Sequence, residues 1–134
     1  MTRRQLEHAV SIVFPDVRLK QYLEIRVADS MPPEYIYAYA AWTKGLFADR
    51  EKLYQLYEKF EQYIPQGSMS EKAVEEGKCS LIEHGYDGVI YGRRAYEWLE
   101  DMKRLVIEQL SEQDCGYAKP LFQAVEQRCS VRNR

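Results

Sequence analysis

The spacing of apolar residues along the chain predicts a mainly helical protein with one or two short strands. In four stretches the apolar residues recur at intervals of three and four, which is the period of a helix with one buried face. A fifth, shorter and charged stretch follows a serine that can cap a helix, Ser68 or Ser70. The predicted helices span residues 34–47, 50–63, 71–79, 92–110 and 119–129. Residues 114–116 are expected to form a loop before the last helix. Residues 89–91 are too few to form an independent strand.

Near the N-terminus the pattern changes to strict alternation, which predicts one strand over residues 18–27. A turn with two prolines follows it, and the helical region then runs over residues 33–129. Four of the five residues on one face of this strand are apolar: Leu19, Gln21, Leu23, Ile25 and Val27. The other face carries three cations, a carboxylate and a phenol: Arg18, Lys20, Tyr22, Glu24 and Arg26.

A lone strand leaves rows of backbone N–H and C=O groups unpaired along both edges. Three arrangements would satisfy these groups. The strand could pair with residues 89–91, with another chain, or with further strands of a larger sheet from which this sequence is a piece.

The charged face of the strand carries an E-x-R triplet, Glu24 to Arg26. Carboxylate oxygens bind hard ions such as Mg²⁺, and guanidinium forks bind the anionic oxygens of phosphates. The triplet therefore suits a site where a divalent metal meets phosphate. The simpler interpretation is a solvated strand face, whose cross-strand ion pairs contribute only about 0.2–1 kcal/mol each.

Composition indicates an ordinary globular protein. The 134 residues are enough for one domain with a hydrophobic core, and 46% of them are apolar and 30% charged. A net charge of −2 gives no basic surface for nucleic acid. No apolar run approaches the roughly 20 residues of a membrane span, and no signal peptide is recognisable, so we expect a cytoplasmic protein. Three cysteines far apart in the sequence do not indicate a disulfide framework or a metal site.

The strand belongs to a longer sequence motif, which is more specific than the E-x-R triplet alone. The segments FPDVRLKQYLEIR, ADSMPP and AYAAWTKGLFAD follow one another over roughly residues 5–50. Together they resemble the C-terminal catalytic segment of the glutamate–cysteine ligase family and, more distantly, the matching segment of glutamine synthetase. The resemblance covers about a third of the chain. It implies that the chain is the C-terminal part of a glutamine-synthetase-like α+β catalytic domain.

The resemblance also implies a chemistry. The family uses ATP and Mg²⁺ to join the side-chain carboxyl of glutamate to the amine of cysteine through an acyl phosphate. By position, Glu24 matches the metal ligand, and Arg26 matches the arginine that meets the phosphoryl group or the glutamate carboxylate. Arg18 would add a phosphate contact, and Lys20 would bind the nucleotide together with Arg26. Asp29, in the turn after the strand, could support them.

Much of such an enzyme is absent from the sequence. The nucleotide pocket and the cysteine site of the family have no counterparts in the sequence, and Glu24 alone cannot hold Mg²⁺ tightly. The motifs of other enzyme classes, a P-loop or a hydrolase triad, are not found either. The family builds its site on a large antiparallel sheet from a longer chain. We therefore expect a fragment that is inactive alone and that acts with an N-terminal ligase polypeptide, or that self-associates through the strand edge. The amine acceptor, cysteine or another amino acid, stays open.

Two other interpretations compete with the ligase. The chain could be a non-catalytic helical module for binding or assembly that retains a relic of the motif. Alternatively, the resemblance is accidental, in which case Arg18, Glu24 and Arg26 should point into solvent without converging.

Overall fold

The computed structural model describes residues 2, 5, 17–19, 21–28, 30–63 and 71–129. The chain divides into two compact units, Met1–Ser30 and Met31–Arg134. The boundary between the units falls between the expected motif strand and the expected helical region.

In the first unit the motif segment forms a β-hairpin, which differs from the single strand expected over residues 18–27. β1 (Val17–Leu19) pairs antiparallel with β2 (Leu23–Ile25) in a two-stranded sheet. Folding back lets the two halves satisfy each other's backbone N–H and C=O groups, which a lone strand would leave unpaired. Residues 89–91 do not supply the partner strand.

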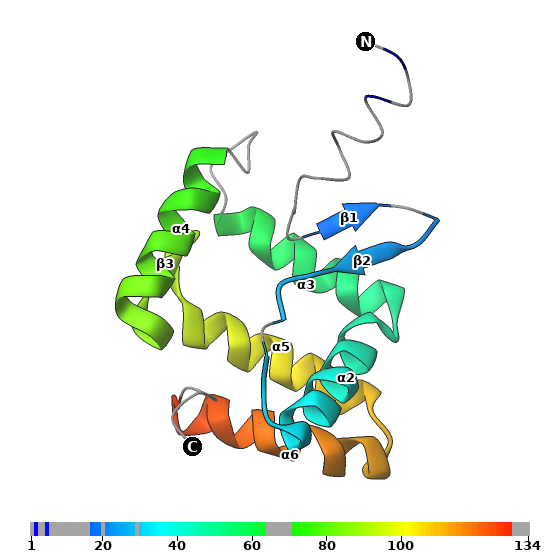
Figure 1. The fold of residues 1–134 in the computed structure, drawn as a ribbon. Coiled ribbons are helices and arrows are strands. Elements are labelled where there is room, and N and C mark those ends of the chain that lie inside the picture. The colour runs from blue at the N-terminus through cyan, green and yellow to red at the C-terminus, as the bar shows by residue number, and fades with distance from the viewer. Residues whose placement is uncertain are drawn as a thin grey trace. The chain divides into compact units, whose positions relative to one another are not determined.

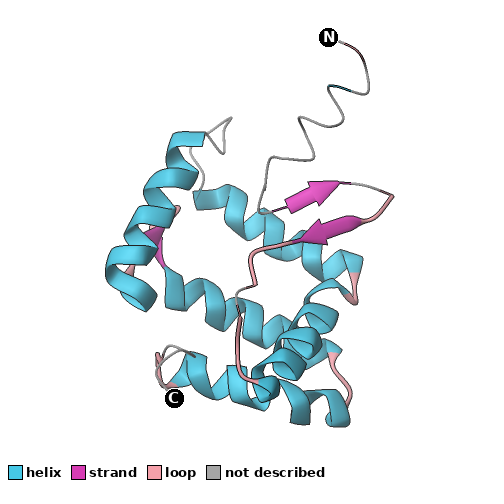
Figure 2. Ribbon diagram, in the orientation of Figure 1, coloured by secondary structure: helices cyan, strands magenta, loops and turns pink. Residues whose placement is uncertain are grey.

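The second unit is helical with one further β-hairpin (Figure 1; Figure 2). The mainly helical fold with short strands that the sequence predicts is therefore confirmed. In chain order the elements are α2 (Pro33–Phe47), α3 (Arg50–Tyr63), α4 (Glu71–His84), the 3₁₀ helix η1 (Gly85–Asp87), β3 (Val89–Ile90), β4 (Arg93–Arg94), α5 (Ala95–Gln109) and α6 (Glu112–Glu126).

The core of this unit is a seam of apolar residues between α2, α5 and α6. Its buried members are Ala41 of α2, Val106 of α5, and Ala118 and Phe122 of α6. Gly45 of α2 faces α5 so closely that an added Cβ would lie 2.8 Å from the Cγ1 atom of Val106. The absence of a side chain at Gly45 therefore allows the two helices to pack closely.

The last helix begins earlier than expected, so the predicted loop at residues 114–116 is wrong. The Ser111 hydroxyl accepts a hydrogen bond from the Asp114 backbone N–H at 3.2 Å and caps α6. Glu112 and Asp114 place negative charge in the first turn, where the helix dipole favours it. The cap and the packing of Phe122 outweigh the weak helix propensities of the glycine and proline inside α6.

Residues 92–94, expected at the start of a long helix, instead belong to the hairpin of β3 and β4. Val89 lies opposite Arg94 and Ile90 opposite Arg93, which leaves Tyr91 and Gly92 as the turn. Both turn residues have positive φ, 48° and 74°, as the tight turns of two-residue hairpins require. The segment expected to be too short for a strand thus pairs with the residues directly after it.

Candidate functional site

The first hairpin places two of the motif residues next to each other. Arg18 in β1 and Glu24 in β2 are directly opposed in the antiparallel register. Opposed residues lie on the same face of a sheet, so the arginine and the carboxylate share one face. Val17 and Ile25 form the next opposed pair and lie on the other face. The hairpin therefore keeps the separation of charged and apolar faces that the alternation predicts.

Arg18 and Glu24 form an ion pair within the hairpin. The Arg18 Nε donates a hydrogen bond to Glu24 Oε2 at 2.7 Å, and Arg18 Nη2 lies 2.7 Å from the same oxygen. The two side chains are 22% and 31% exposed, so the pair is partly withdrawn from water. Arg18 and Glu24 therefore meet each other, as cross-strand ion pairs on a solvated strand face also do. The pairing also means that either group must exchange its partner before it binds a ligand.

The other proposed site residues are less closely tied to this pair. Arg26 follows β2 directly and is partly buried. Lys20 and Asp29 lie outside the described residues. The structure thus brings Arg18 and Glu24 together, with Arg26 two residues further along the chain.

The described side chains do not form a metal site by themselves. Within the described ranges, no three His, Cys, Asp or Glu side chains gather closely enough to hold a metal ion. Glu24 offers one carboxylate, and Arg18 already binds one of its oxygens. Mg²⁺ prefers near-octahedral oxygen ligation, so the residues described here do not fit this ion without further ligands.

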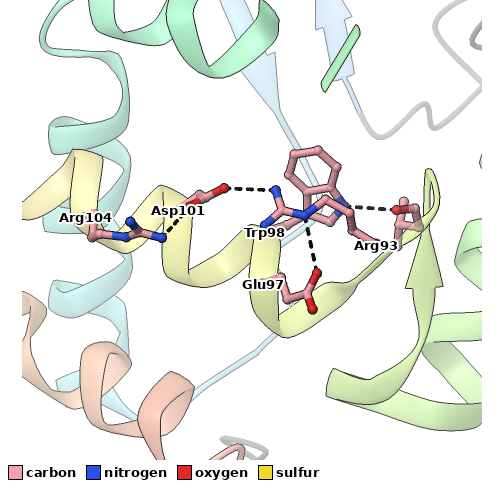
Figure 3. Close-up of polar contacts among 6 residues, drawn as sticks. Arg93, Glu97, Trp98, Asp101 and Arg104 are labelled. Carbon is pink, nitrogen blue, oxygen red and sulfur yellow. Dashed lines mark hydrogen bonds and ion pairs between the residues drawn. The ribbon is translucent and has the colours of Figure 1, made fainter. Parts of the chain in front are cut away.

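A second polar cluster, around Arg93, lies in the helical unit (Figure 3). Arg93 Nη1 donates a hydrogen bond to Asp101 Oδ2 at 2.9 Å, and its Nε donates to Glu97 Oε2 at 3.3 Å. The other oxygen of Asp101 accepts a hydrogen bond from Arg104 at 2.6 Å. Two guanidinium groups therefore balance two carboxylates.

Aromatic rings cover the same guanidinium group. The Cζ atom of Arg93 lies 4.4 Å from the ring centroid of Trp98 and 5.2 Å from that of Tyr63. The Trp98 indole N–H donates to the carbonyl oxygen of Ile90 at 2.9 Å (Figure 3). The cluster thus joins the end of α3, the β3–β4 hairpin and α5.

The chemistry of the Arg93 cluster is that of a structural support. Hydrogen bonding to Asp101 raises the pKa of Arg93 further above its already high value, so the group stays charged. Its hydrogen bonds go to carboxylates within the protein, and the charges cancel, which leaves little reason for an anion to bind. Sequence analysis missed this cluster. The only local signal is the i, i+4 spacing of Arg93 and Glu97, because Tyr63 comes from a distant element.

Comparison with curated proteins supports a distant relationship to glutamate–cysteine ligases. A stretch of 52 residues is 42% identical to glutamate–cysteine ligase A, chloroplastic, of Oryza sativa subsp. indica. A stretch of 52 residues is also 42% identical to glutamate–cysteine ligase B, chloroplastic, of Oryza sativa subsp. japonica. The match covers 39% of this chain but only 11% and 10% of the rice proteins.

The other two comparisons found no counterpart. No protein-family model matches the chain, and no solved structure matches it. The likeness to plant ligases therefore rests on the aligned stretch alone. Among the described residues, none of the helices combines the length and apolar character needed to cross a membrane.

Proposed function

We propose that this chain is the C-terminal portion of an ATP- and Mg²⁺-dependent ligase similar to glutamate–cysteine ligase, which joins a carboxylate to an amine. The observation that carries the proposal is the cross-strand pair of Arg18 and Glu24, because two residues assigned to the site from the motif lie side by side. The similarity to the rice ligases supports the same conclusion.

In this proposal the hairpin contributes one part of an active site. Arg18 and Arg26 bind anionic oxygens of the transferring phosphoryl group or of glutamate, and Lys20 assists Arg26 with the nucleotide. Glu24 supplies one of the metal ligands. The ion pair keeps Arg18 and Glu24 close together, and each gives up part of this pairing when the ligands bind.

In this proposal the remaining Mg²⁺ ligands come from a partner polypeptide, because Glu24 is a single carboxylate and does not complete a Mg²⁺ site. The first hairpin supports such a partner. A two-stranded sheet is marginal alone, and its apolar face leaves Val17 48% and Leu23 55% exposed. An N-terminal ligase polypeptide that extends this sheet would cover that face and supply further carboxylates. The chain alone is then inactive, and the substrates of the assembled enzyme are glutamate and cysteine or another amino acid.

A second function is a helical binding or assembly module that keeps the motif as a relic. The helical unit favours it, because this unit has its own packed core and a charge-balanced Arg93 cluster. In that case the hairpin residues have no role in nucleotide binding.

Calorimetric titration separates the two functions. The purified chain is titrated with a non-hydrolysable ATP analogue, with and without Mg²⁺, beside the variants Glu24→Gln and Arg26→Ala. Glu75→Gln removes one exposed carboxylate from α4 and serves as the matched control. The ligase proposal predicts Mg²⁺-dependent binding that is lost in the two hairpin variants and kept in the control.

The opposite outcomes are equally informative. Binding that is the same in all four proteins would place the nucleotide away from the hairpin and contradict the assigned roles. Absence of binding in every protein would contradict a hairpin that binds nucleotide by itself. It would leave an incomplete fragment or the binding module, and a pull-down would then be the next test.

A further inference from the structure

Helix α3 exposes a face that the proposed ligase chemistry does not use. Arg50, Tyr54, Tyr57 and Glu61 follow one another at spacings of four, three and four residues, and all four are exposed. At 3.6 residues per turn this spacing places them within about 60° of each other around the helix. We call these four residues the α3 face.

The centre of the α3 face is aromatic and adjoins an apolar groove. The ring centroids of Tyr54 and Tyr57 are 6.2 Å apart, and the side chains are 60% and 44% exposed. Both rings and Arg50 line a groove of about 480 Å³. Its other lining residues are apolar: Leu46, Leu53, Leu56 and Met102. Exposed tyrosines beside such a groove are typical of contact surfaces, where rigid rings bury area at little entropic cost.

The ends of the α3 face carry opposite charges. Arg50 lies at the first residue of α3 and forms no ion pair with another described residue. Glu61 lies in the last turn, and its carboxylate raises the pKa of the Tyr57 hydroxyl through hydrogen bonding and charge. The cation and the carboxylate are equally far from the midpoint between the two tyrosines.

We propose that two copies of this chain associate through the α3 face, with the two α3 helices antiparallel about a two-fold axis between Tyr54 and Tyr57. Arg50 of each copy then meets Glu61 of the other, and Tyr54 of each copy meets Tyr57 of the other. A two-fold axis requires a self-complementary surface, and this order of cation, ring, ring and carboxylate has that property.

The order of charges along the α3 face favours a second antiparallel copy of this chain over other partners. Parallel α3 helices would place like charges together, which costs free energy. A partner helix that carried charges of only one sign would be attracted to one end of the α3 face and repelled by the other end. A second copy in antiparallel orientation satisfies both ends. The proposal does not depend on the ligase function, since none of the hairpin residues takes part.

Charge reversal tests the dimer. Analytical ultracentrifugation is run up to about 200 µM on the chain and on the variants Arg50→Glu, Glu61→Arg and the double variant, because an interface smaller than about 800 Å² per partner is expected to be weak. Each single reversal creates two like-charge contacts across the axis and should raise the dimer Kd at least about tenfold. The double variant restores opposite charges and should recover dimerisation.

The variants keep the monomer folded, so the test reports association. Arg50→Glu adds an acid to the first turn of α3 and Glu61→Arg adds a base to the last turn, both of which the helix dipole favours. Lys59→Glu changes one exposed charge on the opposite side of α3 and should leave the Kd unchanged. A monomer throughout the concentration range, a dimer that the single reversals do not weaken, or a double variant that stays monomeric would each overturn the proposal.

Discussion

Replacing Gly45 by alanine should destabilise the protein, although alanine is the better helix former. An alanine Cβ at this position would lie 2.8 Å from Val106 Cγ1 and 3.0 Å from Leu110 Cγ. Carbon atoms pack best at about 3.5–4.0 Å, so one helix must move away. Val106 is fully buried and β-branched, so its side chain strongly prefers one rotamer within a helix and cannot easily turn away.

Two opposing terms set the size of the effect. Overpacking of a well-packed core costs about 1–3 kcal/mol. Alanine stabilises a helix interior by about 1 kcal/mol relative to glycine, which offsets part of this cost. The net expectation is a loss of about 1 kcal/mol in the free energy of unfolding, which lowers the Tm by about 4 °C for a domain of this size.

Urea unfolding followed by far-ultraviolet circular dichroism measures this loss. Gly116→Ala in α6 is the matched control, because no described atom outside its own turn lies within 4 Å of the added Cβ. That substitution should stabilise the protein by up to about 1 kcal/mol. In a Val106→Ala background the 2.8 Å contact is absent and only the contact with Leu110 remains, so Gly45→Ala should cost less free energy of unfolding there. If Gly45→Ala stabilises as much as Gly116→Ala, the close approach of α2 and α5 is refuted.

Two further predictions concern ion pairs of the helical unit. Arg93→Leu should lower the free energy of unfolding by about 2 kcal/mol, because it leaves partly buried carboxylates without their main partner, whereas Arg93→Lys recovers less than half. Urea unfolding checks both, and an Arg93→Leu variant of unchanged stability would contradict the role given to the cluster. Hydrogen bonds from Lys44 and then from Ser111 lower the pKa of Asp114, so its contribution is present above its usual value of 3.8 and lost as pH falls through the lowered pKa. The stability difference between the protein and Asp114→Asn should therefore shrink in acid, and a difference that persists well below pH 3.8 would argue against this assignment.

Elements with strong local signals could be predicted closely. α3 runs from Arg50 to Tyr63 as expected, because Asp49 caps it through hydrogen bonds from the backbone N–H groups of Glu51 and Lys52, at 2.8 and 3.2 Å. Proline at the first position likewise marks the start of α2. Caps and prolines act within a few residues, so the sequence carries this information directly.

Features that depend on distant contacts could not be predicted. Alternation in residues 18–27 is the same for one strand or for a hairpin, so the pairing of Arg18 with Glu24 depends on a turn that the pattern does not specify. The Arg93 cluster needs Tyr63 from the far end of α3. For the candidate site, the motif therefore identified residues, and the fold decided which of them meet.

The Arg93 cluster also determines which segments of the helical unit should unfold together. α4 contacts both η1 and β3, and the β3–β4 hairpin is held to α5 by the ion pairs of Arg93 and by the hydrogen bond from Trp98 to Ile90. Segments that share a few anchoring contacts tend to unfold together below the global free energy of unfolding. The amide protons from α4 to β4 should then exchange with solvent as one cooperative group, before those of the seam between α2, α5 and α6.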